Sequence, residues 1–230
     1  MLRIEALDAH YGLFQALFGV SFDVAPGETV ALIGANGAGK TTLLRSLAGA
    51  QAVRPESVRL EGEPIGGAPE RRQLARGIAL VPEGRRLFSS LTVEENLQLA
   101  ARNGRSGPWT QARVLECLPA LCPLLRRPAT ALSGGQQQLV AIARALVCNP
   151  SYLLCDEVSL GLSPLAVEEV YRLLALARRD GMAILLVEQN VQRALVSSDR
   201  FVCLQKGRVV FEGISATADR HAVAQAYFGV

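Results

Sequence analysis

The stretch TVALIGANGAGKT, from Thr29 to Thr41, decides the fold of this chain. Its first part, Thr29–Ile33, is an apolar run that predicts a strand buried on both faces. Leucines at helical spacing predict a helix over Lys40–Ala48. The segment between them fits the pattern GxxxxGK[ST], and this strand–loop–helix context predicts a phosphate-binding loop.

The chemistry of the loop follows from its residue types. Glycines let backbone N–H groups curl around phosphate oxygens, and the N-terminus of the following helix favours the anion. We expect Lys40 to bridge the outer phosphates of a nucleotide and Thr41 to ligate Mg²⁺. An ordinary glycine-rich turn is the alternative, but it does not require the flanking strand and helix. The expected nucleotide-binding residues of the loop are Gly34, Asn36, Gly37, Ala38, Gly39, Lys40, Thr41 and Thr42.

Most of the remaining chain alternates apolar strands with helices. The pattern predicts helices over 134–148 and 163–181 and strands over 77–81, 152–155 and 182–187. Such alternation is typical of an α/β fold in which a mainly parallel sheet is covered on both sides. The fold class expected from the pattern is therefore α/β.

The two ends and the middle of the chain depart from this alternation. Amphipathic strands at both ends, 2–7 with 20–24 and the hairpin 201–211, predict an added antiparallel sheet. From about 92 to 150 the pattern changes to helix. We therefore predict one domain over residues 1–230. Its core and β-subdomain cover 1–85 and 150–230, and a helical subdomain covers about 86–149.

The composition limits the class of protein. Half of the residues are hydrophobic and 20% are charged, which is enough apolar material for a full core. The net charge of +3 is too small to argue for nucleic acid as a partner. Five cysteines without a C-x-x-C pair fit a reducing compartment. No apolar run approaches the ~18 residues of a membrane span, so we expect a soluble chain.

Two carboxylates follow the apolar run YLLC, directly after the predicted strand over 152–155. At the carboxyl end of a strand, Asp156 can reach Mg²⁺ held beside the phosphate loop. Glu157, one residue further, can polarise a water molecule against the γ-phosphate. The alternative is a strand that simply ends in solvated acidic residues.

The pentapeptide LSGGQ, residues 132–136, precedes a helix. Ser133 is a good N-cap, and Gly134 and Gly135 expose backbone N–H groups at the helix start. These features predict a second helix end that binds an anion, in a chain that already has one. An ordinary capped helix would also explain them.

The phosphate loop, LSGGQ and LLCDE, in this order and spacing, resemble the ATP-binding subunits of ABC transporters over essentially the whole chain. The resemblance implies a P-loop NTPase core, an N-terminal antiparallel β-subdomain and a helical insertion. It implies a head-to-tail homodimer or heterodimer that binds two ATP molecules with Mg²⁺. Each phosphate loop would face Ser133, Gly134, Gly135 and Gln136 of the other subunit. Further implied partners are transmembrane permease subunits and, indirectly, a solute-binding protein. The implied location is cytoplasmic, on the inner face of the cell membrane.

The resemblance also assigns single residues. Tyr11 matches the aromatic residue that stacks on adenine, although a turn aromatic packed on the core is the alternative. Glu157 matches the catalytic glutamate. Glu83 stands where most members have a glutamine that contacts Mg²⁺, and a carboxylate can still ligate the ion. Val158 stands where proline is usual, which weakens the expected rigidity of the loop over 159–163 that crosses the dimer interface.

Gln189 occupies the place of a histidine that holds the γ-phosphate and the attacking water in the family. The chain has only His10 and His221, and neither can fill this role. A glutamine amide can donate a hydrogen bond to a phosphate oxygen but cannot carry a positive charge. We interpret Gln189 as a working catalytic residue.

The segments PEGRR (82–86) and LTVEENL (91–97), together with Gln189, resemble one branch of the family. That branch is the second ATPase of branched-chain amino-acid uptake systems. The expected function is ATP hydrolysis that powers uptake of branched-chain or other hydrophobic amino acids through a separate permease. Arg85, Arg86 and Phe88 would lie near the groove that receives a permease helix, or the arginines would form a solvated basic face.

Three other functions stay open. Close relatives in the branch import urea or short amides. A weakly hydrolysing regulator is a second alternative, because Glu83, Val158 and Gln189 depart from the usual residues. A soluble ATPase acting on DNA or ribosomes is the third. The sequence argues against this third class, because 41–133 holds no sustained heptads and the chain has one set of ATPase motifs.

Overall fold

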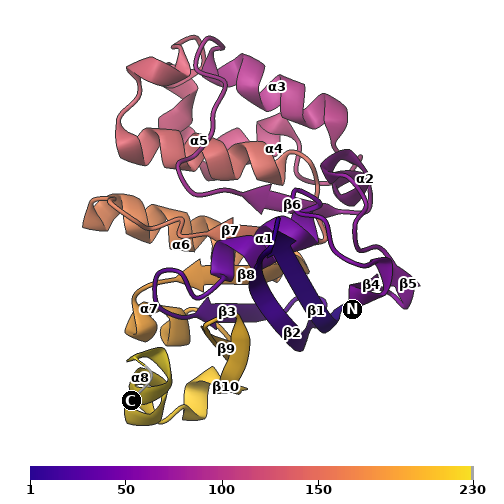
Figure 1. Cartoon of the computed structure of the whole chain (residues 1–230). Coiled ribbons are helices and arrows are strands. Elements are labelled where there is room, and N and C mark those ends of the chain that lie inside the picture. Colours follow the sequence, from indigo (N-terminus) through magenta and orange to yellow (C-terminus); the bar gives the residue numbers. More distant parts are fainter. Residues whose placement is uncertain (229–230) are drawn as a thin grey trace.

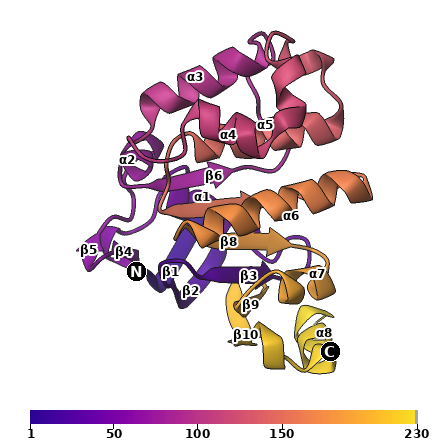
Figure 2. The same cartoon turned by 180° about the vertical axis from the view of Figure 1, so that it is seen from behind.

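The computed structural model describes residues 1–228 and is built around one central sheet (Figures 1 and 2). Within the described part, this sheet has six strands in the order β10-β9-β3-β8-β7-β6. All neighbours pair in parallel except β10, which lies antiparallel to β9 at one edge. The strands are β3 (Thr29–Ile33), β6 (Ile78–Val81), β7 (Tyr152–Asp156), β8 (Ala183–Glu188), β9 (Arg200–Gln205) and β10 (Arg208–Ile214).

The apolar residues of these strands alternate between two faces of the sheet. Val30 and Leu32 of β3 pack with the leucines of α1 (Lys40–Ala48), whereas Ala31 and Ile33 pack against α7 and α8 on the opposite face. This alternation follows from the two-residue period of side chains in a strand. Every residue of β3, β7 and β8 is buried, as expected for strands covered on both sides.

Different layers cover the two faces of the sheet (Figures 1 and 2). One face carries α1 and a second sheet in the order β2-β1-β4-β5, formed by β1 (Leu2–Tyr11), β2 (Phe14–Val24), β4 (Val58–Leu60) and β5 (Glu63–Pro64). The other face carries the remaining long helices, α5 (Gly134–Leu146) and α6 (Pro164–Arg179), with α7 (Val191–Val196) and α8 (Arg220–Phe228) towards the C-terminus. The short α2 (Glu70–Ala75) precedes β6.

The helical segment between β6 and β7 contains α3 (Val93–Asn103), α4 (Gln111–Cys117) and α5. Predicted N-caps begin two of these helices. Thr92 Oγ1 accepts the N–H of Glu95 at 3.2 Å, and the Glu95 carboxylate accepts the N–H of Thr92 at 2.8 Å. Ser133 and Gln136 form the same reciprocal pair at the start of α5. No helix among residues 1–228 combines the length and apolarity needed to cross a bilayer.

The strands and helices around the phosphate loop were predicted correctly, but the C-terminal hairpin was placed wrongly. The hairpin forms, yet β9 joins the central sheet beside β3 and does not extend the antiparallel sheet. The reason is that residues 201–204 of β9 are buried on both faces, so this strand belongs between two covering layers. The N-terminal hairpin is longer than predicted, because register shifts after Ile4 and Leu7 interrupt its alternation.

Leu185 of β8 is 1% exposed in the centre of the core, whereas Val196 of α7 is 76% exposed. Leu185→Ala should lower the free energy of unfolding by about 2–5 kcal/mol, because it removes buried methyl groups and leaves a cavity. Val196→Ala, the control, should change it by less than ~0.5 kcal/mol. Urea denaturation of both variants measures the difference, and equal losses would contradict this arrangement of the core.

Candidate active site

The phosphate loop connects β3 to α1 and depends on glycine at two positions. A Cβ at Gly34 would collide with the carbonyl oxygen of Leu204 in β9, so the close approach of these two backbones requires glycine. Gly39, the residue before α1, has a φ of 106°, which favours glycine because it carries no Cβ. With no side chain at Gly39, the first N–H groups of α1 are left for an anion.

Lys40 is only 5% exposed and is held by the loop itself. Its Nζ donates hydrogen bonds to the carbonyl oxygens of Gly34 at 2.7 Å and Ala35 at 3.0 Å. Burial lowers the pKa of Lys40, and the negative charges of Glu157, Asp156 and Glu83 oppose this shift. An ammonium has three donors, so a third remains for a phosphate oxygen. The arrangement therefore fits a lysine whose position is already suited to binding an anion.

Asp156 ends β7 beside the phosphate loop and is 3% exposed. Its Oδ1 accepts a hydrogen bond from Thr41 Oγ1 at 3.3 Å. Burial raises the pKa of Asp156 to about 6, while the bond from Thr41 acts in the opposite direction. A buried carboxylate next to a hydroxyl fits Mg²⁺, because the cation offsets the desolvation of the charge. These two residues are therefore the ones that would hold Mg²⁺ beside the phosphate loop.

Glu157 and Gln189 are joined by a short hydrogen bond. Gln189 Nε2 donates to Oε2 of Glu157 at 2.6 Å, and the other carboxylate oxygen lies 3.8 Å from Lys40 Nζ. The backbone of Glu157 has a φ of 50°, a region that non-glycine residues rarely adopt. Its N–H donates to the carbonyl oxygen of Val187 in β8 at 3.2 Å. The structure therefore holds the Glu157 carboxylate between a lysine and an amide.

These side chains surround a pocket of about 790 Å³. Its wall includes the predicted residues Tyr11, Asn36, Gly37, Gly39, Lys40, Thr41, Thr42, Glu83, Glu157 and Gln189. Gly34, Ala38 and Asp156, all in the described part of the chain, do not line it. All three are buried, and the carbonyl oxygen of Ala38 accepts the N–H of Gly207 at 2.9 Å. Tyr11 is 44% exposed and its hydroxyl reaches Thr42 Oγ1 only at 3.5 Å, so its ring remains available.

The LSGGQ segment lies apart from this pocket. Among the described residues, none of Ser133, Gly134, Gly135 and Gln136 contributes to the pocket wall. They form the first turn of α5, and the guanidinium of Arg85 lies against Gly134 and donates to Gln137 Oε1 at 3.2 Å. One chain thus has two separate helix N-termini, those of α1 and α5, and anion binding at either of them stays a prediction.

Sequence reasoning missed several residues of the pocket. Phe14 and Phe18 of β2 and Lys206 of the β9–β10 turn also line it. Phe18 carries the guanidinium of Arg208 at 4.8 Å from its ring centre. The Lys-Gly turn was predicted, but nothing local in the sequence places it beside a loop that lies far earlier in the chain.

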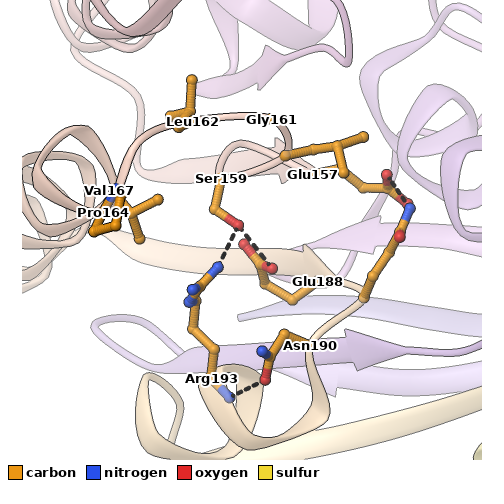
Figure 3. A pocket seen from close by; sticks show the side chains of 11 residues that line it. Glu157, Ser159, Gly161, Leu162, Pro164, Val167, Glu188, Asn190 and Arg193 are labelled. Carbon is orange, nitrogen blue, oxygen red and sulfur yellow. Dashed lines mark hydrogen bonds between the residues drawn. The ribbon is translucent and has the colours of Figure 1, made fainter.

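A second cavity, of about 390 Å³, shares lining residues with the first pocket, and Figure 3 shows the side chains around this second cavity. Glu157, Leu160 and Gln189 line both spaces, so they form the wall between them. Behind this wall, the hydroxyl of Ser159 meets the Glu188 carboxylate at 3.0 Å and the Arg193 guanidinium at 3.0 Å. No sequence pattern predicted this network, because its members come from separate elements.

Comparisons with known proteins agree with this geometry. The model of the family described as ABC transporter matches residues 17–159. A high-affinity branched-chain amino acid transport ATP-binding protein, BraG, of Pseudomonas aeruginosa is 42% identical, and the match covers 100% of both chains. A probable branched-chain amino acid transport ATP-binding protein, LivF, of Archaeoglobus fulgidus is 40% identical, covering 93% of this chain and 92% of that protein.

Solved structures show the same fold. One titled as an ATP-binding subunit of an ABC transporter superposes with a TM-score of 0.87 at 30% identity, over 99% of each chain. A dimeric bacterial ABC transporter cassette superposes with a TM-score of 0.81 at 26% identity, over 94% of this chain and 99% of that one. The chain therefore belongs to the ABC transporter family and has the fold of that family's ATPase subunits.

Proposed function

We propose that this chain binds Mg²⁺-ATP in the 790 Å³ pocket and hydrolyses it with Glu157 and Gln189. One observation carries the proposal: Glu157 lies 3.8 Å from the phosphate-loop lysine through one oxygen and 2.6 Å from the Gln189 amide through the other. A base held between a phosphate-binding cation and an amide donor is suited to activating water beside a γ-phosphate.

The roles of the other residues follow from their positions. Backbone N–H groups of the loop and of the first turn of α1 bind the phosphates, and Lys40 neutralises the outer ones. Tyr11 stacks on the adenine, with Phe14 and Phe18 beside it in the wall. When bound, Mg²⁺ neutralises phosphate charge, and Thr41, Asp156 and Glu83 are the residues that hold it.

In the hydrolytic step, the Glu157 carboxylate accepts a proton from the attacking water. Gln189 orients this carboxylate with one of its two amide N–H donors. The second donor is left for the γ-phosphate or the water. The role expected from the sequence is therefore extended, because the amide contacts the base as well as facing the phosphate.

The active unit is a head-to-tail dimer. In one chain the Ser133–Gln136 turn is separate from the nucleotide pocket, so it does not contact an ATP molecule bound there. The same turn of another subunit can then bind the exposed side of that ATP molecule. A solved cassette with the same fold is titled as dimeric. We propose that Ser133, Gly134, Gly135 and Gln136 bind the γ-phosphate held by the partner's loop.

The solute is a branched-chain or other hydrophobic amino acid, taken up through a separate permease at the inner face of the membrane. Support comes from BraG and LivF, whose names assign them to branched-chain amino acid transport.

The segment Gly84–Arg86 is the proposed contact with the permease. Gly84, Arg85 and Arg86 all have positive φ values, 74°, 66° and 45°. A positive φ costs glycine nothing but strains Arg85 and Arg86, and such strain is common at functional sites. Phe88 is 50% exposed, and the guanidinium carbon of Arg144 lies 5.6 Å from the centre of its ring. Together with the two arginines, Phe88 forms the surface that we propose receives the permease helix.

Lys40→Ala should weaken ATP binding by about 10- to 100-fold, because it removes a charge-assisted hydrogen bond to phosphate in a buried site. Equilibrium binding of a fluorescent ATP analogue measures the effect. Circular dichroism and thermal unfolding check that the variant is folded. Unchanged affinity in the folded variant would show that the nucleotide binds elsewhere.

Glu157→Gln should reduce turnover by about 10²- to 10⁴-fold, since an amide cannot accept the proton from water. ATP binding should persist, and the ATP-bound variant should elute as a dimer in size-exclusion chromatography. Elution as a monomer with ATP bound would rule out the two-chain site, whereas wild-type turnover would remove Glu157 from the proton transfer.

Gln189→Ala should lower turnover by about 10²- to 10³-fold, the effect of losing one positioned donor, while ATP affinity stays within roughly twofold. Gln189→His is the matched control and should retain turnover, because its ring can also donate a hydrogen bond. Steady-state hydrolysis by the transporter assembled in vesicles measures both variants. Wild-type turnover in Gln189→Ala would contradict the proposed role.

A further inference from the structure

Three successive residues, the last two of β8 and the one that follows, contact the loop after β7. The carbonyl oxygen of Val187 accepts the N–H of Glu157 at 3.2 Å. The Glu188 carboxylate accepts the hydroxyl of Ser159 at 3.0 Å, and the Gln189 amide donates to Glu157 at 2.6 Å. Only the first and third of these contacts touch Glu157, so the second requires its own explanation.

Glu188 is a charged residue in a buried position, 3% exposed. Its Oε1 accepts the Tyr171 hydroxyl at 2.6 Å and its Oε2 accepts the Ser159 hydroxyl. Burial raises the pKa of Glu188, and the bonds from Tyr171 and Ser159 act in the opposite direction. Burying a carboxylate costs free energy that an apolar side chain in the same position would not. Its two hydrogen bonds therefore indicate that Glu188 holds the groups that it contacts in place.

Ser159 is the point where this network meets the loop. Its Oγ donates to Glu188 and accepts from Nη1 of Arg193, so β8 and α7 both hold it (Figure 3). Tyr171 links the same carboxylate to α6. The intervening Val158 is 1% exposed in the core, which fixes the backbone between Glu157 and Ser159.

Glu157 needs such support because its backbone has a φ of 50°. A non-glycine residue keeps this conformation only where its surroundings over-determine it. The N–H bond to Val187 fixes Glu157 on its N-terminal side. Ser159, held two residues further, fixes the chain on the C-terminal side.

We propose that Glu188 is a positioning residue for ATP hydrolysis, which holds Ser159 and thereby sets the Glu157 carboxylate against the attacking water. This inference rests on the role of Glu157 proposed above. Among the described residues, Glu188, Ser159 and Arg193 line the second cavity but not the nucleotide pocket. Their loss should therefore change the rate of hydrolysis and leave ATP binding intact.

The first test replaces each end of the network in the full chain. Glu188→Gln keeps the shape but offers one acceptor oxygen where the carboxylate offers two. We expect kcat to fall roughly 10- to 100-fold, because a small displacement of a catalytic group has effects of this size. The KM for ATP and the equilibrium affinity for an ATP analogue should stay within roughly twofold. Tyr171→Phe should act in the same direction, less strongly.

A double-mutant cycle decides whether Glu188 acts through Ser159. If it does, Glu188→Gln combined with Ser159→Ala should be no slower than the slower single variant. Additive losses would overturn the proposal. Ser215→Ala is the matched control, because Ser215 is as buried as Ser159, at 7% exposed, and bonds Ser198 at 2.7 Å away from the site. Its kcat should equal that of the wild type.

Hydrogen exchange gives a readout that does not need turnover. The Leu160 N–H donates to the carbonyl oxygen of Glu157 at 3.1 Å, so its exchange reports the order of the loop. Exchange at Leu160 should accelerate in Glu188→Gln and in Tyr171→Phe, while amides within β8 keep their protection. If Glu188→Gln does not fold, Tyr171→Phe and its cycle with Ser159→Ala decide in its place.

The outcomes separate the two claims. A wild-type chain that binds ATP without hydrolysing it would overturn the proposed function. A wild-type chain that hydrolyses ATP, together with Glu188→Gln at the same kcat and the same Leu160 exchange, would overturn only the role of Glu188.

Discussion

The parallel register of β3, β8 and β7 is the constraint on which the rest of the site depends. Ile33 of β3 pairs with Glu188, and Asp156 of β7 pairs with Val187, so the three strands end at one edge of the sheet. The phosphate loop, Glu157 and Gln189 each follow one of these ends, as ligand sites do at the carboxyl edge of open α/β sheets. A shift of one residue in the register of a strand would turn all its side chains to the opposite face of the sheet. The packing of the core therefore fixes the register, and the register fixes the positions of Glu157 and Gln189.

The proposed site concentrates buried charge that a bound nucleotide and metal ion would neutralise. Lys40 and Asp156 are each at most 5% exposed, and burial shifts the pKa of each towards the neutral form. Because the pKa of Asp156 is about 6 in the folded chain against 3.8 for the free group, ionising Asp156 destabilises the folded chain as pH rises through that interval. In the proposed complex, a divalent cation at Asp156 and phosphates at Lys40 would reverse these penalties, so we expect ligand binding to stabilise the folded chain.

The sequence predicts the parts of this site that depend on local patterns. The phosphate loop, the Asp156–Glu157 strand end and the Ser133 cap each combine a residue pattern with a predicted strand or helix, and the structure places each at the expected element end. Contacts between distant segments were not predictable. β9 joined the parallel sheet because both of its faces are buried. Lys206 reaches the nucleotide pocket, and Tyr171 meets Glu188, only through tertiary packing.

A crystal structure of the full chain with a non-hydrolysable ATP analogue and Mg²⁺ would show whether a single ATP molecule is held by the phosphate loop and Gln189 of one subunit and by the LSGGQ helix end of another. We expect a γ-phosphate within hydrogen-bond reach of Lys40 and Gln189, with Ser133 of a second subunit on its other side. A bound analogue whose γ-phosphate contacts only solvent opposite Lys40, or a Gln189 amide turned away from it, would rule out this two-subunit site.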